Sequence, residues 1–307
     1  MVKNKAPLAS MLVAFYNQVD FVSDTVKGAL GQTYSNLEII FSDDCSTDGT
    51  FQAIQDAVKD YKGPHRVILN RNEPNMGLVP HVNKELFELS HGELIFLNGG
   101  DDISLPKRVE LGVNYFLKHD EVSAVTFSRI TIDKKGNEVW REKKDGDVIQ
   151  SVDDKAYLFS SGFMTRGVGL SFRRSLLNVF GPLSNDCQTE DSTLRFRAML
   201  VGKTLKSGEY GLKYRMHDNN MSRNIFKLKT SPIAEQYRQD LIIAQNIIGP
   251  KLYDVLETKI EFYKSYREID NIIYDASFFM KMIWKMRRVI SLRNYRKAIN
   301  LILNSHL

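Results

Sequence analysis

The chain has 307 residues, of which 43% are hydrophobic and 26% are charged, and its formal net charge is +5. This composition is typical of a globular protein and excludes a collagen-like or intrinsically disordered chain. The two cysteines, Cys45 and Cys187, are too few for a disulfide framework or a four-ligand zinc site, and a cytoplasmic location is the expectation.

Short apolar segments alternate with amphipathic segments through the first 130 residues. Five apolar segments are expected to form strands: residues 8–15, 37–41, 67–69, 94–97 and 122–127. Four segments between them carry apolar side chains at helical spacing: residues 20–30, 50–61, 79–89 and 105–117. Successive strands begin about 30 residues apart, which is the length of a βαβ unit. The pattern predicts an α/β fold with a mostly parallel sheet covered by helices on both faces.

The remainder of the chain is less regular. The sequence Lys134-Lys135-Gly136-Asn137 predicts a hairpin turn between residues 130–132 and 139–140. From residue 226 onward the pattern is mostly helical. From Ile225 to the end, the chain has 14 Lys and Arg against 8 Asp and Glu. The excess of positive charge in the protein therefore lies in this last part.

Residues 277–307 combine apolar side chains at helical spacing with seven basic residues and no acid. A basic amphipathic helix of this kind can bind an anionic membrane surface. It can equally pack on the rest of the protein and leave its charged face in solvent. The sequence leaves both alternatives open, and because no recognition motif accompanies the charge, a nucleic-acid partner is not expected.

Polar residues gather directly after the predicted strands. Tyr16 and Asn17 follow the first strand, and polar stretches at residues 42–50, 70–77 and 98–102 follow the next ones. In an open parallel sheet, ligands bind at the carboxyl ends of the strands. The pair Asp101-Asp102 could cap the following helix. It also supplies the oxygen ligands that Mg²⁺ and Mn²⁺ prefer, so the sequence indicates a divalent cation at this edge.

The common phosphate-binding motifs are missing. No Gly-x-Gly-x-x-Gly follows the first strand, and Gly202-Lys203-Thr204 lacks the glycine that a P-loop needs at position 197, where the chain has Arg197. A bound phosphate would therefore need a metal ion and scattered side chains for neutralisation.

Four blocks of the sequence resemble family-2 glycosyltransferases with the GT-A fold. The first is LASMLVAFYNQVDFVSDTVKGALGQTYSNLEIIFSDDCSTDGT, and the second is NMGLVPHVNKELFELSHGELIFLNGGDDISLP, which ends in the D-x-D region. Glu190-Asp191 resembles the later acidic motif, and Tyr214-Arg215-Met216-His217 resembles the last block. The resemblance covers about residues 8–222, and the order and spacing of the blocks agree with the family.

The resemblance implies a role for each matching residue. The catalytic base would be Asp191, and the principal metal ligand would be Asp102, with His217 as a further metal or diphosphate ligand. The nucleotide would be bound by Ala14, Tyr16, Asn17, Asp44, Asn75 and Asp101. The family usually has one more acid, two residues before the first of the pair, where this chain has Gly99. The metal site would thus have one carboxylate fewer than is usual.

These expectations combine into a functional hypothesis. The protein would transfer a sugar from a nucleotide sugar, expected to be a UDP-sugar, to a glycan or lipid-linked acceptor in surface polysaccharide synthesis at the inner face of the cell membrane. The reaction would need Mn²⁺ or Mg²⁺, and one base without a covalent nucleophile predicts inversion. Nucleotidyl transfer and nucleotide or glycan binding without turnover are the alternatives.

The same resemblance predicts how the chain is divided. Residues 1–224 would form the GT-A domain, with a nucleotide-sugar half at about 1–128 and an acceptor half at about 129–224. Residues 225–307 would form a helical extension whose basic tail begins at about residue 277.

Overall fold

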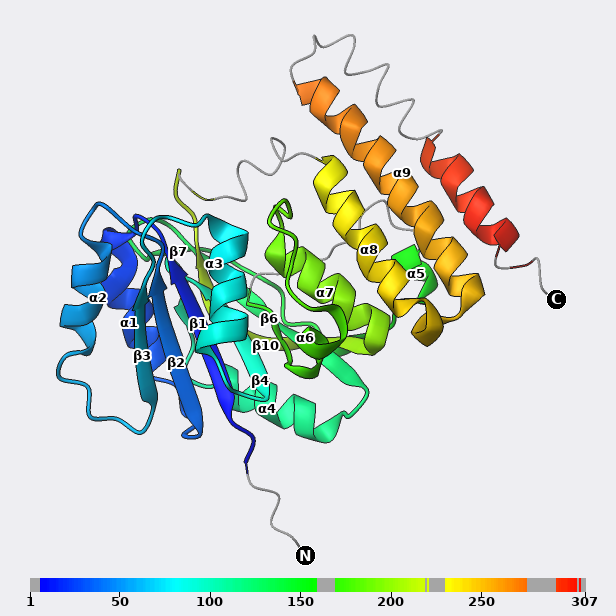
Figure 1. Cartoon of the computed structure of the whole chain (residues 1–307). Coiled ribbons are helices and arrows are strands. Elements are labelled where there is room, and N and C mark those ends of the chain that lie inside the picture. Colours follow the sequence, from blue (N-terminus) through cyan, green and yellow to red (C-terminus); the bar gives the residue numbers. More distant parts are fainter. Residues whose placement is uncertain are drawn as a thin grey trace, which may run out of the picture.

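A mixed β-sheet runs through the protein and carries helices on both faces (Figure 1). The computed structural model describes residues 6–158, 169–218, 220, 230–274, 291–302 and 304. The main path of the sheet has the strand order β3-β2-β1-β4-β9-β6-β10-β5. The first four strands of this path run parallel to one another. They are β1 (Ala9–Phe15), β2 (Leu37–Asp43), β3 (Arg66–Arg71) and β4 (Leu94–Gly99).

Side chains alternate between the two faces of each strand, and this alternation divides the core. Met11 and Val13 of β1 belong to one buried cluster, whereas Leu12 between them belongs to the other. The first cluster is covered by α1 (Val22–Leu30), α2 (Thr50–Val58) and α4 (Arg108–Lys118). The opposite face is covered by α3 (Leu78–Lys84) and η2 (Glu85–Leu89). The 3-10 helix η1 (Val19–Phe21) precedes α1.

The second half of the sheet mixes strand directions. β9 (Ser171–Arg173) lies antiparallel between β4 and β6 (Val122–Ile132), and β6 runs parallel to β10 (Lys203–Arg215). The antiparallel strands β5 (Ile103–Ser104), β7 (Glu138–Arg141) and β8 (Val148–Gln150) pair with β10, β6 and β10. The predicted α/β fold is confirmed, with a parallel half and a mixed half. The hairpin β6–β7 turns at Gly136, whose φ of +91° suits a residue without a side chain.

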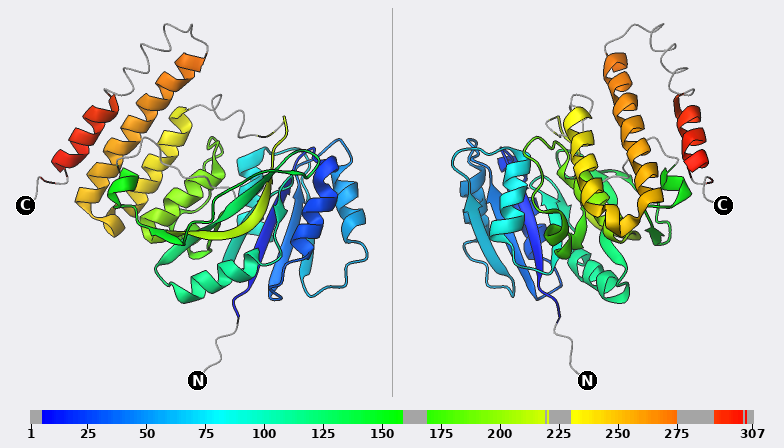
Figure 2. Two further views of the ribbon diagram at one scale, coloured as in Figure 1. Left: turned by 180° about the vertical axis from the view of Figure 1, so that it is seen from behind. Right: turned by 45° about the vertical axis from the view of Figure 1, so that its right-hand side comes forward.

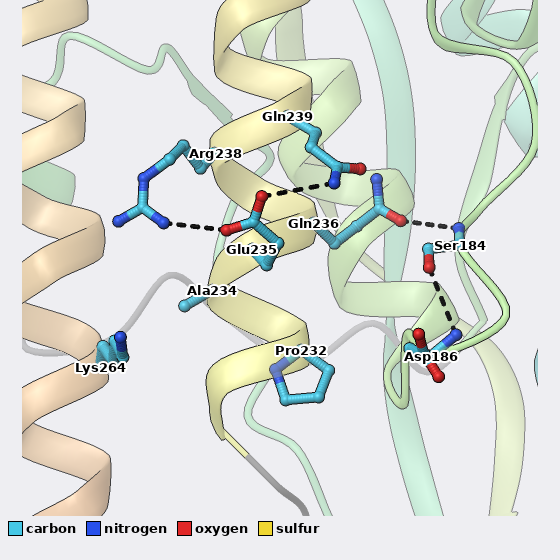
Figure 3. Close-up of a pocket in the computed structure, with 9 residues that line it drawn as sticks. All are labelled: Ser184, Asp186, Pro232, Ala234, Glu235, Gln236, Arg238, Gln239 and Lys264. Carbon is cyan, nitrogen blue, oxygen red and sulfur yellow. Dashed lines mark hydrogen bonds and ion pairs between the residues drawn. The ribbon is translucent and has the colours of Figure 1, made fainter.

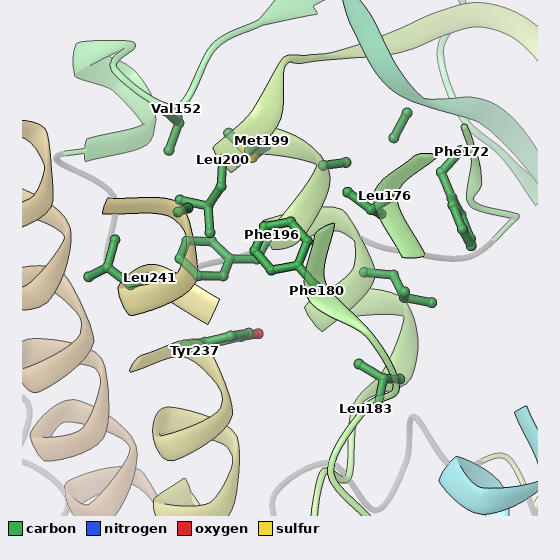
Figure 4. Packing of buried hydrophobic residues seen from close by; sticks show 14 of the residues in the cluster. Val152, Phe172, Leu176, Phe180, Leu183, Phe196, Met199, Leu200, Tyr237 and Leu241 are labelled. Carbon is green, nitrogen blue, oxygen red and sulfur yellow. The ribbon is translucent and has the colours of Figure 1, made fainter. Parts of the chain in front are cut away.

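Helices from the second half of the chain pack in layers beside the sheet (Figure 2). In Figure 4, Phe196 of α7 contacts Tyr237 of α8, with ring centroids 4.9 Å apart. The same buried cluster runs from Leu12 in β1 to Ile299 near the end of the chain, so it crosses the predicted boundary at residue 224. The division into a GT-A domain and an extension stays a prediction. The helices are α5 (Lys155–Leu158), α6 (Ser175–Phe180), α7 (Glu190–Val201), α8 (Thr230–Ile248) and α9 (Pro250–Tyr274).

The predicted basic tail is described only in part. Residues 275–290, which carry four of its basic residues, lie outside the described part of the chain. Residues 291–302 are helical and lie along α9, where the Tyr295 ring stacks on Phe262 at a centroid distance of 4.3 Å (Figure 2). Ile299 is fully buried. For this stretch the contacts favour packing on the protein over a free membrane-binding helix. In the described ranges, no helix combines the length and apolarity that crossing a bilayer requires.

A buried ion pair fastens α7 to α8. Nε of Arg197 lies 2.9 Å from Oδ2 of Asp240, and both side chains are almost completely buried. We expect Asp240→Ala to lower the free energy of unfolding by about 3–5 kcal/mol, because it leaves a buried guanidinium without its partner. Urea unfolding measures the change. Glu235→Ala is the matched control: its exposed ion pair with Arg238 should contribute less than about 1 kcal/mol. Equal losses in the two variants would contradict the prediction.

Candidate active site

A cavity of about 550 Å³ opens at the carboxyl ends of β1, β2 and β4. This is the edge at which open parallel sheets bind ligands, because the loops after adjacent strands converge there. Six of the nine residues assigned to the site from the sequence line this cavity: Ala14, Tyr16, Asp44, Asn75, Asp101 and Asp191. The structure therefore brings together residues that are up to 177 positions apart in the chain.

The cavity is strongly acidic. Among its described lining residues there are five carboxyl groups and neither a lysine nor an arginine. A diphosphate entering such a cavity would be repelled unless a cation accompanied it. The five acids are Asp44, Glu85, Asp101, Glu190 and Asp191.

Asp44 organises the loop between β3 and α3. Its Oδ1 accepts hydrogen bonds from the side chain of Asn72 and the backbone N–H of Met76, both at 2.9 Å. Its Oδ2 accepts a bond from the backbone N–H of Gly77 at 2.8 Å, and Asn75 donates to the Asp44 carbonyl. The carboxylate thus fixes this loop against the end of β2, in addition to facing the cavity.

Asn17 lies beside the cavity and is not among its lining residues. Its backbone has a φ of +51°, a left-handed conformation that asparagine tolerates better than most residues. Its side-chain oxygen accepts a bond from the backbone N–H of Thr47 at 2.9 Å, and its own N–H donates to Ser46 Oγ. Asn17 therefore joins the loops after β1 and β2, while its neighbour Tyr16 remains half-exposed at the cavity.

Asp101 and His217 meet at the edge of the cavity. Nε2 of His217 lies 2.8 Å from Oδ2 of Asp101, and the side chain of Asn220 donates to the same oxygen at 3.2 Å. The imidazole ring also packs against Phe21, with ring centroids 4.8 Å apart. The segment after β10 thus places an imidazole nitrogen next to the carboxylate that follows β4.

Asp102 is placed differently from the sequence expectation. Its side chain is buried, it does not line the cavity, and its Oδ1 accepts a hydrogen bond from the backbone N–H of Arg215 at 2.9 Å. Arg215 in turn donates to the carbonyl of Asp101 and pairs with Asp24 at 2.8 Å. Asp102 therefore attaches β10 to the loop after β4, and Asp101 is the acid of this pair that faces the cavity.

Glu190 and Asp191 form the first turn of α7 and are partly buried at the cavity. Burial and the neighbouring Asp191 carboxylate raise the pKa of Glu190 to about 8. Burial also raises the pKa of Asp191, although hydrogen bonds from Ser192 oppose this shift. The pair thus keeps one proton near neutral pH, and the ionised member can act as a base.

The raised pKa of Glu190 predicts a pH-dependent stability. A folded-state pKa of about 8, against an ordinary value of 4.5, makes the folded protein bind more protons than the unfolded chain between these values. This contribution to stability is complete below pH 4.5 and is lost as the pH rises towards 8. Between pH 5 and pH 8, we expect the Tm of Glu190→Gln to fall less than the Tm of the wild type, as measured by thermal melts. Parallel Tm curves would contradict the assignment.

Two cavity residues, His81 and Glu85, were missed by the sequence reasoning. Both are buried on the face of α3 and η2 that also carries the core residues Val82 and Leu86. The available signal was the placement of two ionisable side chains within the apolar stripe of a predicted helix. Such residues are rarely buried without a partner or a function.

A second cavity of about 400 Å³ lies between α8, α9 and residues 184–186 (Figure 3). Its polar groups mostly bind one another. Glu235 pairs with Arg238 and accepts from Gln239, and Gln236 accepts a bond from the backbone N–H of Ser184 at 2.7 Å. The cavity contains none of the residues assigned to the site from the sequence.

The family is shown by comparison with known proteins. The model of glycosyl transferase family 2 matches residues 10–180, which is more than half of the chain. The chain therefore belongs to glycosyl transferase family 2, and the predicted enzyme class, a glycosyltransferase, is confirmed. Asp191 and His217 lie beyond the matched residues.

Individual relatives agree with this assignment. An uncharacterized glycosyltransferase of Haemophilus influenzae is 25% identical over 285 residues, which cover 88% of this chain and 85% of that protein. The UDP-Glc:alpha-D-GlcNAc-diphosphoundecaprenol beta-1,3-glucosyltransferase WfaP of Escherichia coli is 31% identical over 134 residues, which cover 39% of this chain and 51% of WfaP. The match to WfaP thus spans about two fifths of this chain and about half of WfaP.

A solved structure supports the fold. The crystal structure of S. aureus TarS 1–349 in complex with UDP-GlcNAc superimposes with a TM-score of 0.62 at 14% sequence identity. The match covers 97% of this chain and 92% of the TarS chain. The expected GT-A fold is confirmed by this likeness.

Proposed function

We propose that the protein transfers a sugar from a UDP-sugar to a hydroxyl group of a glycan or lipid-linked acceptor, with inversion at the anomeric carbon. One observation carries the proposal. The cavity at the sheet edge brings five of the six predicted nucleotide-binding residues, Asp101 among them, together with the predicted base Asp191. The UDP-GlcNAc in the related TarS structure and the UDP-Glc in the name of WfaP support a uridine nucleotide.

A divalent cation fits at Asp101 and His217. Carboxylate oxygen and imidazole nitrogen are ligands that Mn²⁺ accepts, and Oδ2 of Asp101 already lies 2.8 Å from Nε2 of His217. No group of three or more His, Cys, Asp or Glu that could hold a metal occurs among the described residues, so diphosphate oxygens and water would complete the coordination. A bound Mn²⁺ or Mg²⁺ would neutralise the charge that develops on the diphosphate leaving group. We assign the ligand role to Asp101 in place of Asp102, because Asp102 bonds the backbone of β10.

The chain's own residues supply the proton transfer. Asp191 would accept the proton of the acceptor hydroxyl as its oxygen bonds to the anomeric carbon and the bond to the nucleoside diphosphate breaks. Glu190, which keeps its proton near neutral pH, would not compete for this role. A single displacement with one base inverts the configuration of the anomeric carbon.

The acceptor is proposed from the relatives and from charge. The name of WfaP specifies a sugar on a diphospholipid carrier, and the basic C-terminal part of this chain would suit an anionic membrane surface. We propose a lipid-linked glycan as acceptor and a peripheral position at the inner face of the membrane.

Turnover of nucleotide sugars tests the proposal. The protein would be incubated with UDP-glucose, UDP-galactose and UDP-N-acetylglucosamine, with Mn²⁺ or with EDTA, and the release of UDP would be followed. Release of UDP that requires the metal supports a glycosyltransferase reaction. Binding of UDP without turnover of any donor, with glycan acceptors present, would contradict it, and release of pyrophosphate from a nucleoside triphosphate would indicate nucleotidyl transfer.

A further inference from the structure

We propose that Glu85 binds the sugar of the nucleotide-sugar donor through a hydroxyl or amide N–H group, and so makes the enzyme select neutral sugars over uronic acids. This inference rests on the proposed function, because it assigns the sugar-binding part of the same cavity.

The first observation is a buried carboxyl oxygen without a hydrogen-bond partner. Glu85 is 1% exposed and lines the cavity, and its Oε1 has no hydrogen-bond partner within the described part of the chain. A buried polar atom of this kind is costly, since it has lost its water and gained nothing in exchange. A bound ligand with a hydroxyl or N–H group would remove the cost.

The neighbouring histidine does not neutralise Glu85. Nε2 of His81 lies 4.0 Å from Oε1 of Glu85, too far for a hydrogen bond. The same nitrogen lies 2.6 Å from Oγ of Ser42, which also accepts a bond from Asn70. Burial lowers the pKa of His81, which keeps the ring neutral, and burial together with Asp44 and Glu190 raises the pKa of Glu85. Glu85 is thus available to donate one hydrogen bond and to accept another.

The second observation is the position of Glu85 in the cavity. It lines the same cavity as Asp44, at the end of β2, and Glu190, at the start of α7. Asp44 belongs to the proposed nucleotide end, and Glu190 adjoins the proposed base. The donor sugar connects the nucleotide to the reacting hydroxyl and therefore has to pass this point. Apolar side chains of Leu12, Val82 and Leu97 line the same cavity and suit the apolar face of a sugar ring.

The charge of the cavity decides which sugars fit. A uronic acid would bring its carboxylate into a space whose described lining residues include neither a lysine nor an arginine, so its charge would be partly buried without a partner, which is strongly unfavourable. Hydroxyl and acetamido groups instead offer hydrogen-bond donors to Glu85. The substrate class is therefore a UDP-hexose or a UDP-N-acetylhexosamine.

Donor kinetics of two variants test this role. In Glu85→Leu, we expect the KM for the UDP-sugar that the wild type uses to rise about 10- to 100-fold, because the hydrogen bond is lost. The inhibition constant of UDP alone, which lacks the sugar, should stay unchanged. Glu85→Gln should recover most of the loss, since an amide can also donate and accept. Glu88→Leu, an exposed acid in the same turn, is the control and should behave as the wild type.

The outcomes separate the two proposals. If the wild type turns over no nucleotide sugar, the proposed function fails. If the wild type is active, two results would overturn the role of Glu85. One is a KM for the UDP-sugar in Glu85→Leu equal to that of the wild type, and the other is a rise in the inhibition constant of UDP as large as the rise in KM. A measurement on the wild type alone gives a second test. Its kcat/KM for UDP-glucose or UDP-N-acetylglucosamine should be at least about 10-fold higher than its kcat/KM for UDP-glucuronic acid. A preference for UDP-glucuronic acid would overturn the inference.

Discussion

Replacing Asp191 with asparagine is expected to lower kcat by about 10²- to 10⁴-fold, the usual contribution of a general base. Asparagine keeps the size of the side chain and can still accept the hydrogen bond from the N–H of Ser192, so α7 should stay in place. Donor binding should be almost unchanged, because Asp191 acts on the acceptor. Steady-state kinetics with a saturating UDP-sugar, together with calorimetry of UDP, would separate the two effects.

A matched control is available for Asp191. Asp186 is an exposed acid in the segment that precedes α7, and Asp186→Asn should leave kcat as it is in the wild type. Near-normal turnover in Asp191→Asn would reduce Asp191 to a residue that interacts with the dipole at the start of α7. A fall in donor affinity that matches the fall in kcat would instead place Asp191 at the nucleotide.

The second large effect is expected at Asp101. Asp101→Asn should abolish the part of UDP binding that depends on Mn²⁺, because the variant loses the carboxylate that lies 2.8 Å from Nε2 of His217. UDP affinity with Mn²⁺ should then equal the affinity measured with EDTA. Calorimetric titration of UDP in both conditions measures this directly.

Asp102→Asn distinguishes the two acids of the pair. Because Oδ1 of Asp102 accepts from the backbone N–H of Arg215, an asparagine at this position can keep the same bond. We expect Asp102→Asn to retain metal-dependent UDP binding. The opposite result, with Asp102→Asn losing this binding and Asp101→Asn keeping it, would restore Asp102 as the principal ligand.

The general plan of the fold follows from the sequence. Apolar strands such as residues 37–41 and 94–97 carry almost no polar side chain, so they can only be covered on both faces, and amphipathic helices lie between them. The same reasoning placed Asp44, Asn75 and Asp101 at one edge, since loops after parallel strands emerge on the same side of the sheet. The acidic pair at the start of α7 was recognised only because its block resembles the family.

The roles of individual side chains depended on tertiary contacts. Asp101 and Asp102 are adjacent in the sequence and equally suited to a metal, and only the approach of β10 decides that Asp102 bonds Arg215 while Asp101 meets His217. Such a contact joins residues more than 100 positions apart, and no local pattern encodes it. Glu85 likewise resembles an ordinary helix residue in the sequence. Its Oε1 is buried without a hydrogen bond from the described residues because the sheet, α3 and α7 surround one cavity, and this enclosure leaves the oxygen available to a ligand.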